Sequence, residues 1–165
     1  MSLSVIEELL SSMPAHDVAP IGFDEGDLRK VELLYDVRLK GQFKQFLLEA
    51  GKSDGGLIGD AMMPLYRPTW HIRDHFVFQY NFFNEMQEEG FYEFLNKPFV
   101  VSLLSDSQYY FIQTSLEKSD VIYHYDSNGG AVNATEWDLL GFLKVLLSYN
   151  EGVLQTPTVG HLLDI

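Results

Sequence analysis

Two histidines four positions apart are the residues best spaced for chemistry. On a helix, His71 and His75 would present two imidazoles on one face, where they could bind a metal ion. Zinc needs at least a third ligand, and Ile72 occupies the position at which the H-E-x-x-H pattern of metalloproteases has its glutamate. Arg73, between the two histidines, would repel a cation. We therefore expect no metal site, and we keep a metal protein or enzyme built on this pair as an alternative.

Two glycine-containing loops resemble known ligand-binding loops without completing them. The Gly-Lys-Ser run at 51–53 matches the end of a P-loop, but Phe46 stands where the first glycine should be. The Asp-Ser-Asn-Gly-Gly run at 126–130 opens like a calcium loop, but Gly130 and Trp137 stand at its fifth and twelfth positions, where carboxylate or amide oxygens are needed. No G-x-S-x-G nucleophile elbow occurs in the sequence. We expect no cofactor and no catalytic activity.

Residues 74–96 combine acidic and aromatic side chains and contain no lysine or arginine. The acids are Asp74, Glu85, Glu88, Glu89 and Glu93. The aromatic residues are Phe76, Phe78, Tyr80, Phe82, Phe83, Phe91, Tyr92 and Phe94. Rings beside unneutralised carboxylates could form a contact surface for a basic protein, with the rings as anchors and the carboxylates attracting the partner. The alternative is that the rings form core and the acids form a solvated rim.

The charge balance excludes several classes of partner. The chain has 24 Asp and Glu against 11 Lys and Arg, a formal net charge of −13. Nucleic acid and anionic membrane surfaces both require clustered basic side chains, so we expect neither as a partner. A basic protein would instead be attracted. Cysteine is absent, which excludes disulfides, thiolate nucleophiles and cysteine-ligated zinc.

The length of 165 residues fits one domain, which we expect to span residues 1–165. The N-terminus carries early acids and no basic segment, so we expect no signal peptide. The longest apolar stretch, residues 99–104, is far too short to span a membrane. These features predict a soluble, cytoplasmic protein.

Hydrophobic spacing predicts helices in the first third of the chain, within about residues 4–50. The first covers 4–13, Asp24 or Asp27 caps the second, and the third runs from about 41 to 50. Gly51 is expected to end the third helix because glycine accepts a positive φ. The apolar run at 57–65 is a candidate strand.

Residues 70–89 fit two patterns. Phe76, Phe78, Tyr80 and Phe82 alternate as in a strand, whereas Phe76, Tyr80 and Phe83 share one helical stripe. The length of the segment and its polar end favour a helix that ends at Gly90.

The last third predicts an antiparallel meander followed by a helix. Short segments rich in β-branched and aromatic residues cover 99–104, 109–114 and 121–125, and their connections are short. Residues 126–130 form a turn. Asn133 or Thr135 is then expected to cap a final helix over about 135–149, on which the buried face includes Trp137. The prediction is an α+β domain with a mainly antiparallel sheet within about residues 57–125, flanked by helices.

The same residues resemble a known superfamily. Val31-Glu32, Leu39, Phe43, Phe46-Leu47 and Gly55-Gly56 are spaced as in the SUKH superfamily, which includes the Smi/Knr-type cell-wall-assembly regulators. The similarity extends through the apolar strand after Pro98 and the closing helix, and covers roughly residues 27–147.

This resemblance implies a SUKH-like, non-catalytic protein-binding domain. Most bacterial members resemble immunity proteins that neutralise toxins, often nucleases, and a nuclease is basic where it grips its substrate. We therefore predict a basic toxin domain as the partner, with a Smi/Knr-like regulatory or scaffold module as the alternative. Charge clustering, and no family motif, selects the partner-binding residues Glu85, Glu88, Glu89 and Glu93, with Asp106 and Asp126 at strand ends. The oligomeric state stays open.

Overall fold

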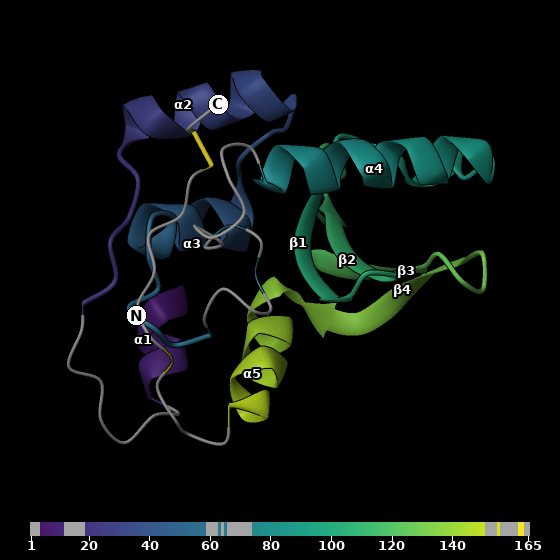
Figure 1. Cartoon of the computed structure of the whole chain (residues 1–165). Coiled ribbons are helices and arrows are strands. Elements are labelled where there is room, and N and C mark those ends of the chain that lie inside the picture. Colours follow the sequence, from purple (N-terminus) through teal and green to yellow (C-terminus); the bar gives the residue numbers. More distant parts are fainter. Residues whose placement is uncertain are drawn as a thin grey trace.

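Three helices form the N-terminal part of the molecule (Figure 1). The computed structural model describes residues 4–11, 19–58, 63, 65, 74–150, 155 and 162–163. Helix α1 spans Val5–Leu10, α2 spans Glu25–Tyr35 and α3 spans Gly41–Ala50, so the helices expected within residues 4–50 are confirmed. The end of the expected first helix, residues 12 and 13, lies outside the described residues.

Both predicted capping residues act at the start of α2. Asp24 is the N-cap and accepts a hydrogen bond from the backbone N–H of Asp27 at 2.7 Å. The Asp27 carboxylate in turn accepts from the N–H of Asp24 at 3.3 Å. This reciprocal capping box satisfies two backbone donors that the first helical turn leaves without partners.

The reason given for Gly51 is wrong. Its φ is −61°, in the right-handed region, so no positive φ is involved. A methyl group there would lie 2.2 Å from a ring carbon of Phe23 and 2.6 Å from the carbonyl oxygen of Leu47. Close packing against Phe23, and not backbone conformation, requires a glycine at this position.

Helix α4 spans Asp74–Glu88, which confirms the helical interpretation of residues 70–89 within the described part of that segment. The stripe it buries differs from the aromatic one that the spacing suggested. Its buried side chains are His75, Gln79, Phe82 and Met86, whereas Phe76 and Tyr80 are exposed. Apolar spacing could not predict this stripe, since two of its four residues are polar. Those two residues, His75 and Gln79, are buried because they hydrogen-bond to backbone groups of a distant strand.

The sheet has four antiparallel strands in the order β1-β2-β3-β4, which confirms the meander and the α+β class. Strand β1 spans Pro98–Ser105, β2 spans Gln108–Gln113, β3 spans Val121–Asp126 and β4 spans Ala131–Asp138. The expected beginning of the sheet at residue 57 is wrong. Leu57 and Ile58 are buried core residues outside any strand, and most of 59–65 lies outside the described residues.

The C-terminal helix begins later than predicted. Residues 131–138 pair with β3, and α5 spans Leu139–Tyr149. Its N-cap is Asp138, whose carboxylate accepts from the N–H of Gly141 at 2.8 Å, so neither Asn133 nor Thr135 caps the helix. Trp137 lies on β4 and is half-buried. The turn at 126–130 folds the chain back onto β3, and this pairing overrides the expected helical start.

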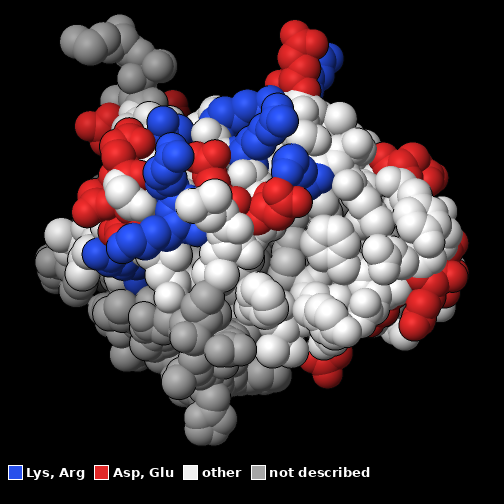
Figure 2. All heavy atoms as spheres, turned by 90° about the horizontal axis from the view of Figure 1, so that it is seen from above, with Lys and Arg blue, Asp and Glu red and all other residues white. Residues whose placement is uncertain are grey.

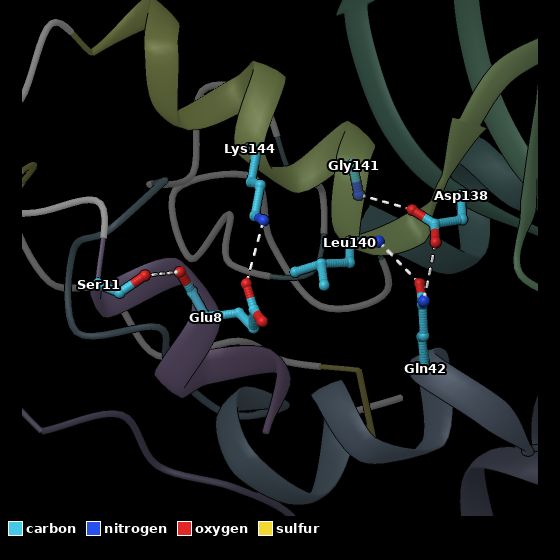
Figure 3. A network of polar contacts seen from close by, with 7 residues as sticks. All are labelled: Glu8, Ser11, Gln42, Asp138, Leu140, Gly141 and Lys144. Atoms are coloured by element: carbon cyan, nitrogen blue, oxygen red, sulfur yellow. Dashed lines mark hydrogen bonds and ion pairs between the residues drawn. The ribbon is translucent and has the colours of Figure 1, made fainter. Parts of the chain in front are cut away.

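A polar network joins α5 to α1 and α3 (Figure 3). The side-chain amide of Gln42 donates to Asp138 at 2.9 Å and accepts from the N–H of Leu140 at 2.8 Å. Lys144 of α5 donates to Glu8 of α1 at 3.1 Å. The first turn of α5 is therefore fixed both by its own cap and by a side chain from α3.

The sheet separates two hydrophobic clusters. One face contributes Phe99, Val101, Ile112 and Ile122 to the larger cluster, together with side chains of α1, α2, α3 and α5. The opposite face packs on Phe82 and Met86 of α4, with strand residues Val100, Leu103, Tyr109, Phe111 and Tyr125. Alternate strand residues thus enter different clusters, and a single α+β domain results.

Candidate functional site

Three separate segments meet at one end of the molecule. The backbone N–H of Ser127 donates to the carbonyl of Ser107 at 2.9 Å, so the β1–β2 and β3–β4 turns are adjacent. A methyl group on Gly130 would lie 3.4 Å from a carboxylate oxygen of Glu89, which places the residue after α4 beside the second turn. In Figure 1, α4 and the β3–β4 turn extend toward the same, right-hand side.

Five of the six predicted binding residues gather there: Glu85, Glu88, Glu89, Asp106 and Asp126. We call this set the acidic end. Below it, the rings of Tyr109 and Tyr125 stack with centroids 5.9 Å apart. Burial, and after it the charges of Glu85, Glu89, Asp126 and Glu88, raise the pKa of Tyr125 to about 12. Burial likewise raises the pKa of Tyr109 to about 12, with contributions from Glu85 and Asp106. The fields of all five carboxylates converge on these two phenols.

Glu85 is a half-buried carboxylate. One carboxylate oxygen accepts a long hydrogen bond from the Tyr109 hydroxyl, at 3.4 Å, and the other is buried without a partner among the described residues. Burial raises the pKa of Glu85, the Tyr109 hydrogen bond lowers it, and the charge of Glu88 raises it. The side chain lines a cavity of about 320 Å³ together with Phe78, Leu103 and Asp106. A cation in this cavity would stabilise the ionised form of Glu85.

Asp126 has a structural task as well. Its Oδ1 accepts from the N–H groups of Asn128 at 2.9 Å and Gly129 at 3.2 Å, and from the side-chain amide of Gln108 at 2.9 Å. These bonds lower the pKa of Asp126, the Gly129 bond most. The residue holds the predicted turn at 126–130 and keeps its charge at the acidic end.

Glu93 is separated from this set. It lies on a short 3-10 helix, η2 (Tyr92–Phe94), and is exposed. No described contact joins its side chain to the other five carboxylates.

The aromatic rings of residues 74–96 are divided between core and surface. Phe82 is fully buried, and Phe78, Phe91 and Phe94 pack partly buried against the same cluster. By contrast, Phe76, Tyr80 and Tyr92 are exposed. One helix therefore carries core rings and surface rings on different faces.

The carboxylates of the acidic end take part in none of the ion pairs found among the described residues. Within residues 74–138, the basic residues are Lys97 and Lys118 alone. Figure 2, which views the molecule from above, shows basic side chains mixed with acidic ones on the left and in the centre of that face, and acidic ones without basic neighbours along the right-hand edge. The charge of this protein is thus unevenly distributed.

Comparisons with protein-family models, curated proteins and solved structures find no match. The SUKH resemblance remains a prediction. None of the helices in the described ranges is long and apolar enough to span a membrane.

His75, one of the two histidines spaced for a metal site, makes contacts in the core. His75 is buried, its Nε2 is hydrogen-bonded to the carbonyl of Val100 at 2.6 Å, and its ring stacks on Phe99 with centroids 4.2 Å apart. Burial lowers the pKa of His75 to about 4, so the imidazole is neutral and donates from Nε2. His71 lies outside the described residues, and the described residues contain no group of three metal-binding side chains.

Gln79, one turn after His75, completes a contact that the sequence did not reveal. The N–H of Val100 donates to its amide oxygen at 2.9 Å, and its amide nitrogen donates to the carbonyl of Pro98. Two α4 side chains thereby satisfy backbone groups of the edge strand β1. The available signal was a polar pair at i, i+4 inside an otherwise aromatic helix.

Proposed function

We propose that this chain is a non-catalytic binding domain that recognises a basic protein through the acidic end. The supporting observation is the convergence of five carboxylates from three chain segments, without an ion-pairing partner among the described residues. In line with the SUKH resemblance, the partner would be a basic toxin domain and the chain an immunity protein. A cytoplasmic location belongs to the same proposal, since a cysteine-free chain suits a reducing compartment.

Electrostatics explains why such a surface favours binding. Like charges held together in the free protein repel one another, and a basic partner replaces that repulsion with attraction. The net charge of −13 accelerates the encounter, and the carboxylates set its orientation. A toxin that grips phosphates must cluster Lys and Arg, so its active site is the surface that this domain would attract and cover.

The experiment compares two triple variants of equal charge. E85Q/E88Q/E89Q alters the acidic end, and E25Q/E117Q/E136Q removes three exposed carboxylates elsewhere, so both change the net charge from −13 to −10. Tagged wild-type protein first captures partners from its native source at about 50 mM and about 300 mM salt, two ionic strengths that differ strongly in screening. Association rates of the captured protein are then measured for all three chains.

We expect a basic partner that is lost at the higher salt, and an association rate about tenfold lower for the acidic-end variant only. Equal effects of the two variants would contradict the proposed surface. Capture of a partner whose binding does not change between the two salt concentrations would favour the regulatory or scaffold alternative.

A further inference from the structure

An apolar groove lies between the end of α2 and α4. It has a volume of about 200 Å³, and its apolar lining consists of Leu34, Tyr35, Phe76, Tyr80 and Phe83. We call it the aromatic groove. Two of its lining side chains are among the large apolar ones that the described residues expose: Tyr80 at 60% and Phe76 at 38%. Their chain neighbours include two more, Val77 next to Phe76 at 51% and Leu33 next to Leu34 at 76%. Exposed apolar side chains gathered in this way are typical of an interaction surface.

The floor of the groove is fixed. Tyr35 is buried, and its hydroxyl donates to the carbonyl of Leu162. Its ring meets His75 and Phe99 edge-on, with centroid distances of 5.4 and 5.7 Å, and lies 6.0 Å from Phe76. A groove with a fixed floor and aromatic walls loses little conformational entropy when a side chain enters it.

One continuous helix connects the groove to the acidic end. Glu88 follows Tyr80 by eight residues, a separation of about 12 Å along an α-helix. Residues 74–96 contain no lysine or arginine, and Lys97, which follows them, is paired with Asp36 at the other wall of the groove. Glu88 is rotated by about 80° from Tyr80 around the helix axis, so a molecule lying along the outer face of α4 would meet Tyr80 first and Glu88 about two turns later. This order of ring and charge selects among possible occupants.

We infer that the aromatic groove receives an apolar side chain from an amphipathic helix of the basic partner, whose Lys or Arg side chains reach the acidic end. This inference rests on the proposed function and adds the anchor to it. Aromatic pockets filled by one apolar side chain dominate the energy of many interfaces, while surrounding charges set rate and orientation. The groove would thus slow dissociation of the complex, and the acidic end would accelerate its association.

The test uses two synthetic helical peptides of identical composition. In the first, a Leu pair at i, i+4 is followed by lysines about two turns later, which matches the spacing of groove and acidic end. In the second, the order is permuted so that no apolar face forms. Affinities for the full chain are measured by titration calorimetry, for the wild type, Tyr80→Ala, Tyr149→Ala and E85Q/E88Q/E89Q. Tyr149 is a matched control because it is 56% exposed and lies on α5.

We expect the first peptide to bind about tenfold more tightly than the second, a difference that Tyr80→Ala abolishes and Tyr149→Ala preserves. Equal affinities of the two peptides, or equal losses in both variants, would overturn the groove inference. If the two peptides bind equally to the wild type and both bind more weakly to E85Q/E88Q/E89Q, the groove inference fails while recognition by the acidic end is retained. If neither peptide binds at about 50 mM salt, where screening is weak, the groove inference fails, and the capture experiment decides the proposed function separately.

Discussion

The two sides of the sheet differ in how their surface charges are paired. On the side of α1, α2, α3 and α5, surface charges pair across elements, as in Lys144–Glu8 at 3.1 Å and Lys52–Asp27 at 3.6 Å. On the side of α4, the carboxylates of the acidic end lack such pairs among the described residues, and the outer face of the helix exposes rings.

Helix ends show the same contrast. The first turn of α2 carries Glu25 and Asp27, where negative charge favours the helix dipole. The last turn of α4 carries Glu85 and Glu88 and no basic residue, where negative charge opposes it. Carboxylates whose position opposes folding are therefore found at the end of α4, where we propose binding.

The largest expected effect contrasts a core ring with a surface ring. Phe43→Ala removes a fully buried side chain of the larger cluster and should lower the free energy of unfolding by about 3–5 kcal/mol. Tyr80→Ala, on the exposed face of α4, should change it by less than about 0.5 kcal/mol. Urea denaturation of both variants measures the difference. A large loss for Tyr80→Ala would show that α4's outer face serves stability after all.

The next effect is a pH dependence from His75. Its pKa falls from 6.5 when unfolded to about 4 in the fold, so between these values the unfolded chain binds the extra proton. Stability therefore decreases as pH falls from 6.5 to 4, by about 3 kcal/mol from this residue. His75→Gln retains a donor for Val100 but does not titrate. Urea titrations at several pH values should show a shallower acid slope for the variant, and parallel curves for the two proteins would contradict the prediction.

The smallest effect sharpens the comparison of helix ends. Glu88→Gln, at the end of α4, should raise the free energy of unfolding by about 0.3–0.5 kcal/mol, because it removes a charge that opposes the dipole. Glu25→Gln, at the start of α2, should lower it by a similar amount. Thermal unfolding at low salt resolves the two signs. The same sign for both would mean that overall charge repulsion, and not helix position, decides.

Much of this architecture could be predicted from local patterns. The capping pair Asp24 and Asp27, the α3 span of Gly41–Ala50 and the first three strands follow from residue types and spacing alone. Such features depend on side chains near in sequence, whose preferences act before any distant contact forms. Charge clustering could select the candidate binding residues, but the fold was needed to bring Glu85, Glu88 and Glu89 together with Asp106 and Asp126.

Other features required distant partners. Residues 131–138 became a strand because the turn held by Asp126 brings them to β3. His75 and Gln79 face inward because Pro98 and Val100 leave backbone groups unsatisfied at the edge of β1.

The sequence by itself therefore determined the composition of the surface: a charge of −13, no basic residue in 74–96, and rings beside acids. Only the tertiary structure decided which rings face outward and which carboxylates are neighbours. The reason is physical: a helix has the same spacing on every face, and the position of the sheet selects the face that is buried.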